Sequence, residues 1–90
     1  MTPTIGRIIH VRIGGTDEEP VLRPAIIVRW WSGSTVNAQV LLDGTNDLEI
    51  ARTSNFAGII DEDACRRGVA WLTSISEGEG IGYWRWPARG

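Results

Sequence analysis

Apolar residues in this sequence recur at every second position within several short segments. In the first segment these residues are Ile5, Ile9, Val11 and Ile13, and in a later one they are Val36, Ala38, Val40 and Leu42. Side chains alternate between the two faces of a β-strand, and β-branched residues fit that pleated surface well. The spacing therefore predicts β-strands that each carry an apolar face.

Further strands and turns follow from the same spacing and from the glycines and prolines. Residues 25–31 form a nearly continuous apolar run, which predicts a central strand that is buried on both faces and begins at Pro24. Residues 69–75 and 81–86 predict two more strands. The turns are predicted at residues 14–20, 32–34, 43–47 and 77–80, the second of them inside a hairpin.

Residues 48–68 show no clear period, although residues 48–51 are compatible with a short strand. Residues 61–68 predict a short helical turn, with Asp61 as the N-terminal cap, acids first, arginines last and Gly68 at its end. Together the segments favour a single mainly β domain over residues 1–90. We expect a small antiparallel SH3-like or partly open barrel of five to six short strands with one short helical turn.

The chain offers few residues for catalysis or for a metal site. A single cysteine, Cys65, cannot form an internal disulfide, and with His10 as the only histidine there is no zinc cluster. His10 has no serine or cysteine neighbour in sequence to activate, and residues 61–63 lack the spacing of a calcium loop. We therefore predict a protein that is not an enzyme and has no cofactor or metal.

The charges argue against a general nucleic-acid partner. Eleven acidic and nine basic residues give a formal net charge of −2, whereas binding to phosphate backbones is driven by excess positive charge. All nine basic residues are arginines. Guanidinium groups suit bidentate capture of phosphate or carboxylate, but a GC-rich genome also favours arginine codons, and both explanations stay open. No apolar stretch approaches the ~20 residues of a membrane span, so we expect no membrane partner.

The 90 residues include five tryptophans. Each of these large rings is expected either to be buried or to take part in a binding surface. Trp84 and Trp86 share one face of the last predicted strand, and Arg85 lies on the other. Trp30 and Trp31 are neighbours, so they cannot both point inward along a regular strand. In each pair the spare ring either fills the core, lies in a subunit interface or holds a ligand.

Six short motifs together resemble a group of small phage and prophage proteins. The motifs are GRIIH at 6–10, RPAIIVR at 23–29, VNAQV at 36–40, DGTND at 43–47, WLTS at 71–74 and GYWRWP at 82–87. The likeness runs nearly end to end except over residues 48–68, where this chain is longer. It implies a viral origin and action in the cytoplasm of an infected bacterium, and it supplies no ligand. In size and in its combination of rings with arginines, the chain is also similar to phage sponges that sequester host immune nucleotides.

We therefore hypothesise a homo-oligomeric binding protein that captures a nucleotide-like host signal without cleaving it. A base would stack on tryptophan, and a phosphate would pair with an arginine. The candidate ligand-binding residues are Trp71, Trp84 and Trp86 for stacking, Arg7, Arg29 and Arg85 for the anion, and Asn37, Gln39, Thr73 and Ser74 for the base or sugar. The alternative is a structural or interaction module, either a minor virion component or an inhibitor that binds a host protein through the same aromatic surface.

Overall fold

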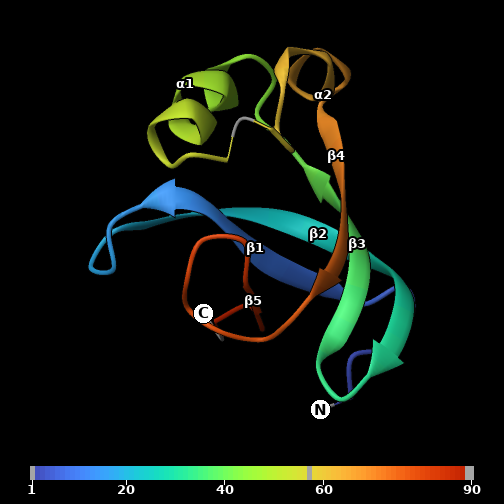
Figure 1. Cartoon of the computed structure of the whole chain (residues 1–90). Coiled ribbons are helices and arrows are strands. Elements are labelled where there is room, and N and C mark those ends of the chain that lie inside the picture. The colour runs from blue at the N-terminus through green and yellow to red at the C-terminus, as the bar shows by residue number, and fades with distance from the viewer. Residues whose placement is uncertain (1, 57, 89–90) are drawn as a thin grey trace.

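The part of the chain that the structure describes, residues 2–56 and 58–88 of a computed structural model, forms one sheet of five antiparallel strands (Figure 1). The strands are β1 (Ile8–Gly15), β2 (Pro20–Ser32), β3 (Thr35–Leu41), β4 (Val69–Ile75) and β5 (Trp84–Arg85), and the helices are α1 (Asn46–Thr53) and α2 (Glu62–Arg67). The strand order is β4-β3-β2-β1-β5. The sheet curls into a small, open, barrel-like fold, which confirms the predicted mainly β class.

The long strand β2 lies at the centre of the sheet and pairs with a different neighbour along each half. Residues 20–26 pair with β1, and residues 25–32 pair with β3. The strand begins at Pro20, so the prediction that Pro24 opens it was wrong. Pro24 has no N–H to donate, and it is tolerated because it lies just before the first residue that pairs with β3.

The core lies between the inner face of the sheet and the two helices (Figure 1). Ile9, Val11 and Ile13 of β1 are fully buried, as their shared parity predicted, and Trp84 of β5 is buried with them. The remaining buried apolar residues are Ala25, Ile27, Val36, Ala38, Val40, Ala51, Phe56, Ile60, Ala64, Cys65, Ala70 and Leu72. Residues from every helix and strand therefore share one core.

Residues 48–51, which were compatible with a short strand, belong instead to helix α1. Asp47 and Glu49 in its first turn and Arg52 in its last turn match the direction of the helix dipole. Ala51 is buried in the core, and this tertiary contact decides between helix and strand for so short an apolar run. Across the described residues, no helix has the length and apolar character that crossing a membrane requires.

The predicted helical turn is confirmed as α2. The Asp61 carboxylate accepts a hydrogen bond from the Ala64 amide at 2.8 Å, and Gly68 ends the helix in the left-handed conformation with φ 77°. Acids lie in the first turn and arginines in the last, as predicted, and Arg66 forms an ion pair with Glu62 one turn away.

Other predictions about the strands were wrong at their ends. Ile5 lies before β1 and is 70% exposed, so it does not join the core. The segment 25–31 is not buried on both faces, since Trp30 and Trp31 are about half exposed near the β2–β3 hairpin, which lies away from the helices (Figure 1). The last strand is shorter than residues 81–86 because the chain turns at Gly82, where φ is 86°.

Candidate functional site

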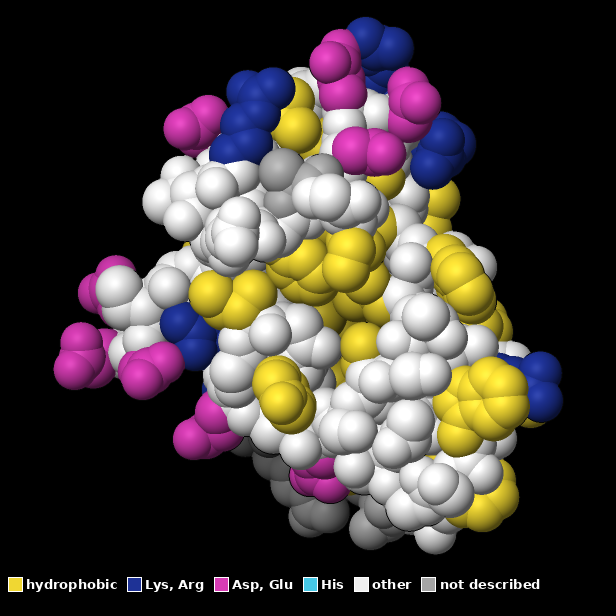
Figure 2. Space-filling view, in the orientation of Figure 1, with side chains coloured by type: hydrophobic (Ala, Val, Ile, Leu, Met, Phe, Trp, Pro, Cys, Tyr) yellow, Lys and Arg dark blue, Asp and Glu magenta, His cyan; other side chains and the backbone are white. Residues whose placement is uncertain are grey.

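A groove of about 700 Å³ lies beside β4, and we call it the β4 groove. Its other walls are the loop between the two helices and the turn before β5. The lining residues are Ser54, Asn55, Phe56, Gly58, Ile59, Trp71, Leu72, Thr73, Ile75, Ile81 and Gly82. Figure 2 shows hydrophobic side chains gathered in a hollow in the middle of this face. The volume is typical of small-molecule sites, and none of these lining residues carries a charge.

The β4 groove runs along the outer edge of β4. This strand is the last one on its side of the sheet, and adjacent residues such as Leu72 and Thr73 both line the groove. Since neighbours along a strand point to opposite faces, a hollow that meets both must lie at the strand edge. Within the described residues, no backbone hydrogen bond joins β4 to the loop across the groove.

Two predicted ligand-binding residues, Trp71 and Thr73, line the β4 groove. The Trp71 side chain is 56% exposed, so part of its ring is accessible to a stacking ligand. Gln39 is the cross-strand partner of Trp71 and lies on the outer face of the sheet, and it is not among the lining residues. The structure therefore separates Gln39 from the groove that Trp71 and Thr73 share.

Asn37 ties the groove wall to the neighbouring strands. Its Oδ1 atom accepts hydrogen bonds from Trp31 Nε1 at 2.8 Å, from Thr73 Oγ1 at 2.9 Å and from the Ser74 amide at 2.8 Å. Ser74 has a positive φ of 55°, and the bond to Asn37 helps to hold that unusual backbone. Because its oxygen already accepts three bonds, Asn37 positions Trp31 and Thr73 rather than reading a base through that atom.

Arg29 lies over the ring of Trp31. The guanidinium carbon is 3.8 Å from the centroid of the ring, and Arg29 is also the cross-strand partner of Asn37. The five residues Arg29, Trp31, Asn37, Thr73 and Ser74 therefore form one group, which we call the Arg29 cluster. All of them were predicted as ligand-binding residues except Trp31, for which core, subunit interface and ligand platform had stayed open.

The C-terminal aromatic residues form a separate group. The Trp84 ring is fully buried, and its Nε1 donates to the Ser34 carbonyl at 2.8 Å. Trp86 meets it edge-on, with 5.1 Å between ring centroids and 86° between planes, and the Arg7 guanidinium lies 5.5 Å from the Trp86 centroid. The stacking role predicted for Trp84 is therefore corrected: the ring fills the core, where no ligand reaches its face.

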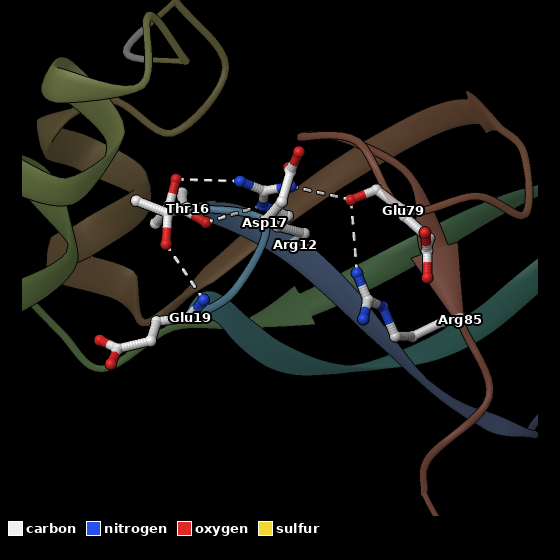
Figure 3. A network of polar contacts seen from close by, with 8 residues as sticks. Arg12, Thr16, Asp17, Glu19, Glu79 and Arg85 are labelled. Carbon is white, nitrogen blue, oxygen red and sulfur yellow. Dashed lines mark hydrogen bonds and ion pairs between the residues drawn. The ribbon is translucent and has the colours of Figure 1, made fainter.

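Arg85 belongs to a polar network around Arg12 (Figure 3). The Arg12 side chain is 6% exposed and donates to the Asp17 carboxylate and to three backbone carbonyls, including that of Glu79. Arg85 Nη2 donates to the same Glu79 carbonyl at 3.3 Å, while Arg85 Nε is buried with no hydrogen-bond partner among the described residues. Backbone carbonyls and a carboxylate surround Arg12, so this network fastens loops together.

The groove walls formed by Phe56, Ile59 and Ile81 were not predicted. Phe56 and Ile59 lie in the segment 48–68, which shows no clear period, and Ile81 was assigned to the last predicted strand, whereas it lies in the turn before β5. Apolar residues in these segments do not by themselves indicate which distant segments meet around a common hollow.

The thiol of Cys65 is a poor candidate for a nucleophile. Cys65 is fully buried, and burial raises the pKa of its thiol, with a further increase from Asp47 and Asp61, so the thiol is a poor nucleophile. In residues 2–56 and 58–88, no cluster of three or more His, Cys, Asp or Glu is placed to hold a metal ion. Comparison of the chain with protein-family models, curated proteins and solved structures gives no match.

Proposed function

We propose that this protein is a binding protein that holds a nucleotide-like ligand in the β4 groove without cleaving it. The observation that carries the proposal is the position of Trp71 and Thr73, which both line the groove, while Thr73 also belongs to the Arg29 cluster. A base that stacks on an accessible aromatic ring gains about 1–3 kcal/mol. The apolar side chains of the groove walls can pack against a stacked base, and the Thr73 hydroxyl can accept a hydrogen bond from the base or sugar.

The proposal extends to a homo-oligomer in the cytoplasm of an infected bacterial cell, where the protein would withdraw a host immune signal from its receptor. The resemblance to small phage proteins supports this setting. Exposed apolar side chains on the outer face of the sheet support self-association, because such surfaces are usually covered by a partner. Ile8 and Leu41, for example, are 47% and 44% exposed and point away from the core.

Thermal-shift screening of cyclic dinucleotides, cyclic trinucleotides and ADP-ribose derivatives tests the proposal. We expect one of them to raise the melting temperature at micromolar concentration, because a ligand that binds only the native state stabilises it by mass action. The ligand should be recovered intact after denaturation. Trp71→Ala should weaken its affinity by about 1–3 kcal/mol.

Trp30→Ala is the matched control for this experiment. It removes a similarly exposed indole that does not line the β4 groove, so it should leave the affinity unchanged. The nucleotide proposal fails when no compound in the screen shifts the melting temperature. The assignment of Trp71 as the stacking residue is contradicted when both variants lose affinity equally, or when neither variant loses affinity.

A second candidate function is an interaction module that captures an extended segment of a host protein. The observation that favours it is the edge of β4, which has no backbone partner across the groove among the described residues. A peptide that adds to a sheet edge gains main-chain hydrogen bonds, and an apolar groove takes its alternate side chains. Such a module would show no thermal shift with nucleotides, and its partner would protect the β4 amides from hydrogen exchange.

A further inference from the structure

Arg29 differs from four other arginines of the described chain in the partner of its charge. Each of Arg12, Arg23, Arg52 and Arg66 lies within 4.0 Å of a carboxylate. Among the described residues, Arg29 has neither an ion pair nor a hydrogen-bond acceptor for its N–H groups, and its guanidinium contacts the face of Trp31 instead. Its donors are therefore available to an external acceptor.

The contact with Trp31 also holds the guanidinium in place. Trp31 is itself fixed by its hydrogen bond to Asn37, and Arg29 extends from β2 directly opposite Asn37. A guanidinium whose face rests on a ring keeps its N–H edge free, and that edge matches an anion with two adjacent oxygens. Because the side chain is already ordered, bidentate binding costs less conformational entropy.

The Arg29 cluster extends away from the β4 groove across the sheet. Thr73 lines the groove and donates to the same Asn37 oxygen that accepts from Trp31. Arg29 lies on β2, two strands from the edge of β4, which corresponds to about 10 Å at the usual strand spacing. Trp71 is in register with Ile26 of β2 through Gln39, three residues before Arg29, so a ligand that reaches both residues spans this width and a further length along the strands. The cyclic dinucleotides and ADP-ribose derivatives of the proposed function are extended molecules of this kind.

We propose that Arg29 binds the phosphate group of the ligand in a bidentate manner while the base occupies the β4 groove. The identity of the ligand rests on the proposed function, whereas the oxyanion site at Arg29 rests on the cluster alone. The other two predicted anion-binding arginines lie outside the Arg29 cluster: Arg7 lies over Trp86, beside β1 and β5, and Arg85 donates to the Glu79 carbonyl. We therefore assign the phosphate contact to Arg29 rather than to Arg7 or Arg85.

Titration of the wild-type protein with inorganic phosphate tests the oxyanion site directly, with the arginine Nε–H signals followed by ¹⁵N NMR at mildly acidic pH. Arg67 is the internal control, because it is exposed on α2 and has no ion pair within the described residues. We expect the Arg29 signal to move saturably with phosphate and the Arg67 signal to move little. An Arg29 signal that moves no more than that of Arg67 would overturn the proposal. An equal response to acetate would overturn the assignment to phosphate.

A pair of variants then links Arg29 to the nucleotide. Arg29→Lys keeps the charge but loses the planar fork, so it should weaken the binding of a nucleotide about tenfold or more and leave its nucleoside unaffected. Arg67→Lys should change neither. Equal nucleotide affinity in both variants would overturn the role of Arg29 and leave the proposed function intact. Absence of nucleotide binding by the wild-type protein would refute the proposed function, and the phosphate titration would still decide whether Arg29 is an oxyanion site.

Discussion

At the scale of single residues, Asp47 is the side chain that joins α1 to β2. Its fully buried carboxylate accepts hydrogen bonds from Arg23 Nε at 2.8 Å, from Arg23 Nη2 at 2.6 Å and from the Asp43 amide at 2.7 Å. Burial by itself raises the pKa of this carboxyl, but the hydrogen bonds and the charge of Arg23 outweigh that effect. The pKa of Asp47 therefore lies below its ordinary value.

Asp47→Asn should lower the free energy of unfolding by about 3 kcal/mol at neutral pH, because it leaves the partly buried Arg23 without its counter-charge. The folded-state pKa of Asp47 lies below the unfolded value of about 3.9. The ion pair therefore contributes fully above that unfolded value and is lost as the pH falls through the folded one. Urea unfolding across this range should show the difference between wild type and variant narrowing in acid.

Glu49→Gln is the control for this series, since Glu49 is an exposed acid on the same helix and its pair with Arg52 is long, at 4.0 Å. This variant should change the stability little at any pH. A difference between wild type and Asp47→Asn that stays constant into strong acid would contradict the role of the Asp47 carboxylate.

At the scale of elements, Arg12 fastens the turn after β1 to the loop before β5 (Figure 3). Its Nε and Nη2 donate to the carbonyls of Gly14 and Gly15, each at 2.9 Å, and its Nη1 donates to the Asp17 carboxylate at 2.8 Å and the Glu79 carbonyl at 3.0 Å. The short strand β5 forms only two cross-strand pairs with β1. The position of the C-terminal segment therefore depends on this side chain as well as on the sheet.

Arg12→Lys should lower the free energy of unfolding by about 3 kcal/mol, because a lysine cannot reproduce the planar fork and leaves carbonyls without donors, among them that of the buried Gly14. Asp17→Asn should have little effect, because the Asp17 side chain is 96% exposed. Denaturant unfolding measures both changes. The Gly82 amide, which donates to the Arg12 carbonyl at 2.8 Å, should also exchange faster in Arg12→Lys. Equally small effects in the two variants would show that the carbonyl contacts are dispensable.

At the scale of the whole molecule, uncharged residues from four strands lie side by side on the outer face of the sheet. Ile8, Ile26, Gln39 and Trp71 are successive cross-strand partners, while the helices pack on the opposite face (Figure 1). The four residues of this row carry no charge, so contact between two copies through them buries no unpaired charge. We place the proposed self-association at Ile8 and Ile26, which leaves Trp71 at the β4 edge of the row accessible to the ligand.

Light scattering over a range of concentrations tests the homo-oligomer. We expect the mass to rise with concentration, and Ile8→Glu to return it to that of one chain, because a charge on this face opposes its burial. Ile5→Glu is the control, since Ile5 is 70% exposed but lies outside the strands. A single-chain mass at every concentration would contradict self-association.

Local sequence was sufficient for features that depend on neighbouring residues. The alternation in β1 identified Ile9, Val11 and Ile13 as core residues, and the cap at Asp61 and the stop at Gly68 located α2. Strand geometry and helix ends follow from backbone preferences within a few residues, and those preferences are recorded in the sequence itself.

Packing between distant segments decided the features that local sequence did not predict. Trp84 and Trp86 share a parity, yet Trp84 alone of the two is fully buried, and residues 48–51 became a helix because one side of it packs against the sheet. The β4 groove joins segments that are far apart along the chain. A local period shows which side chains point the same way, but what covers them depends on long-range contacts that no local pattern records.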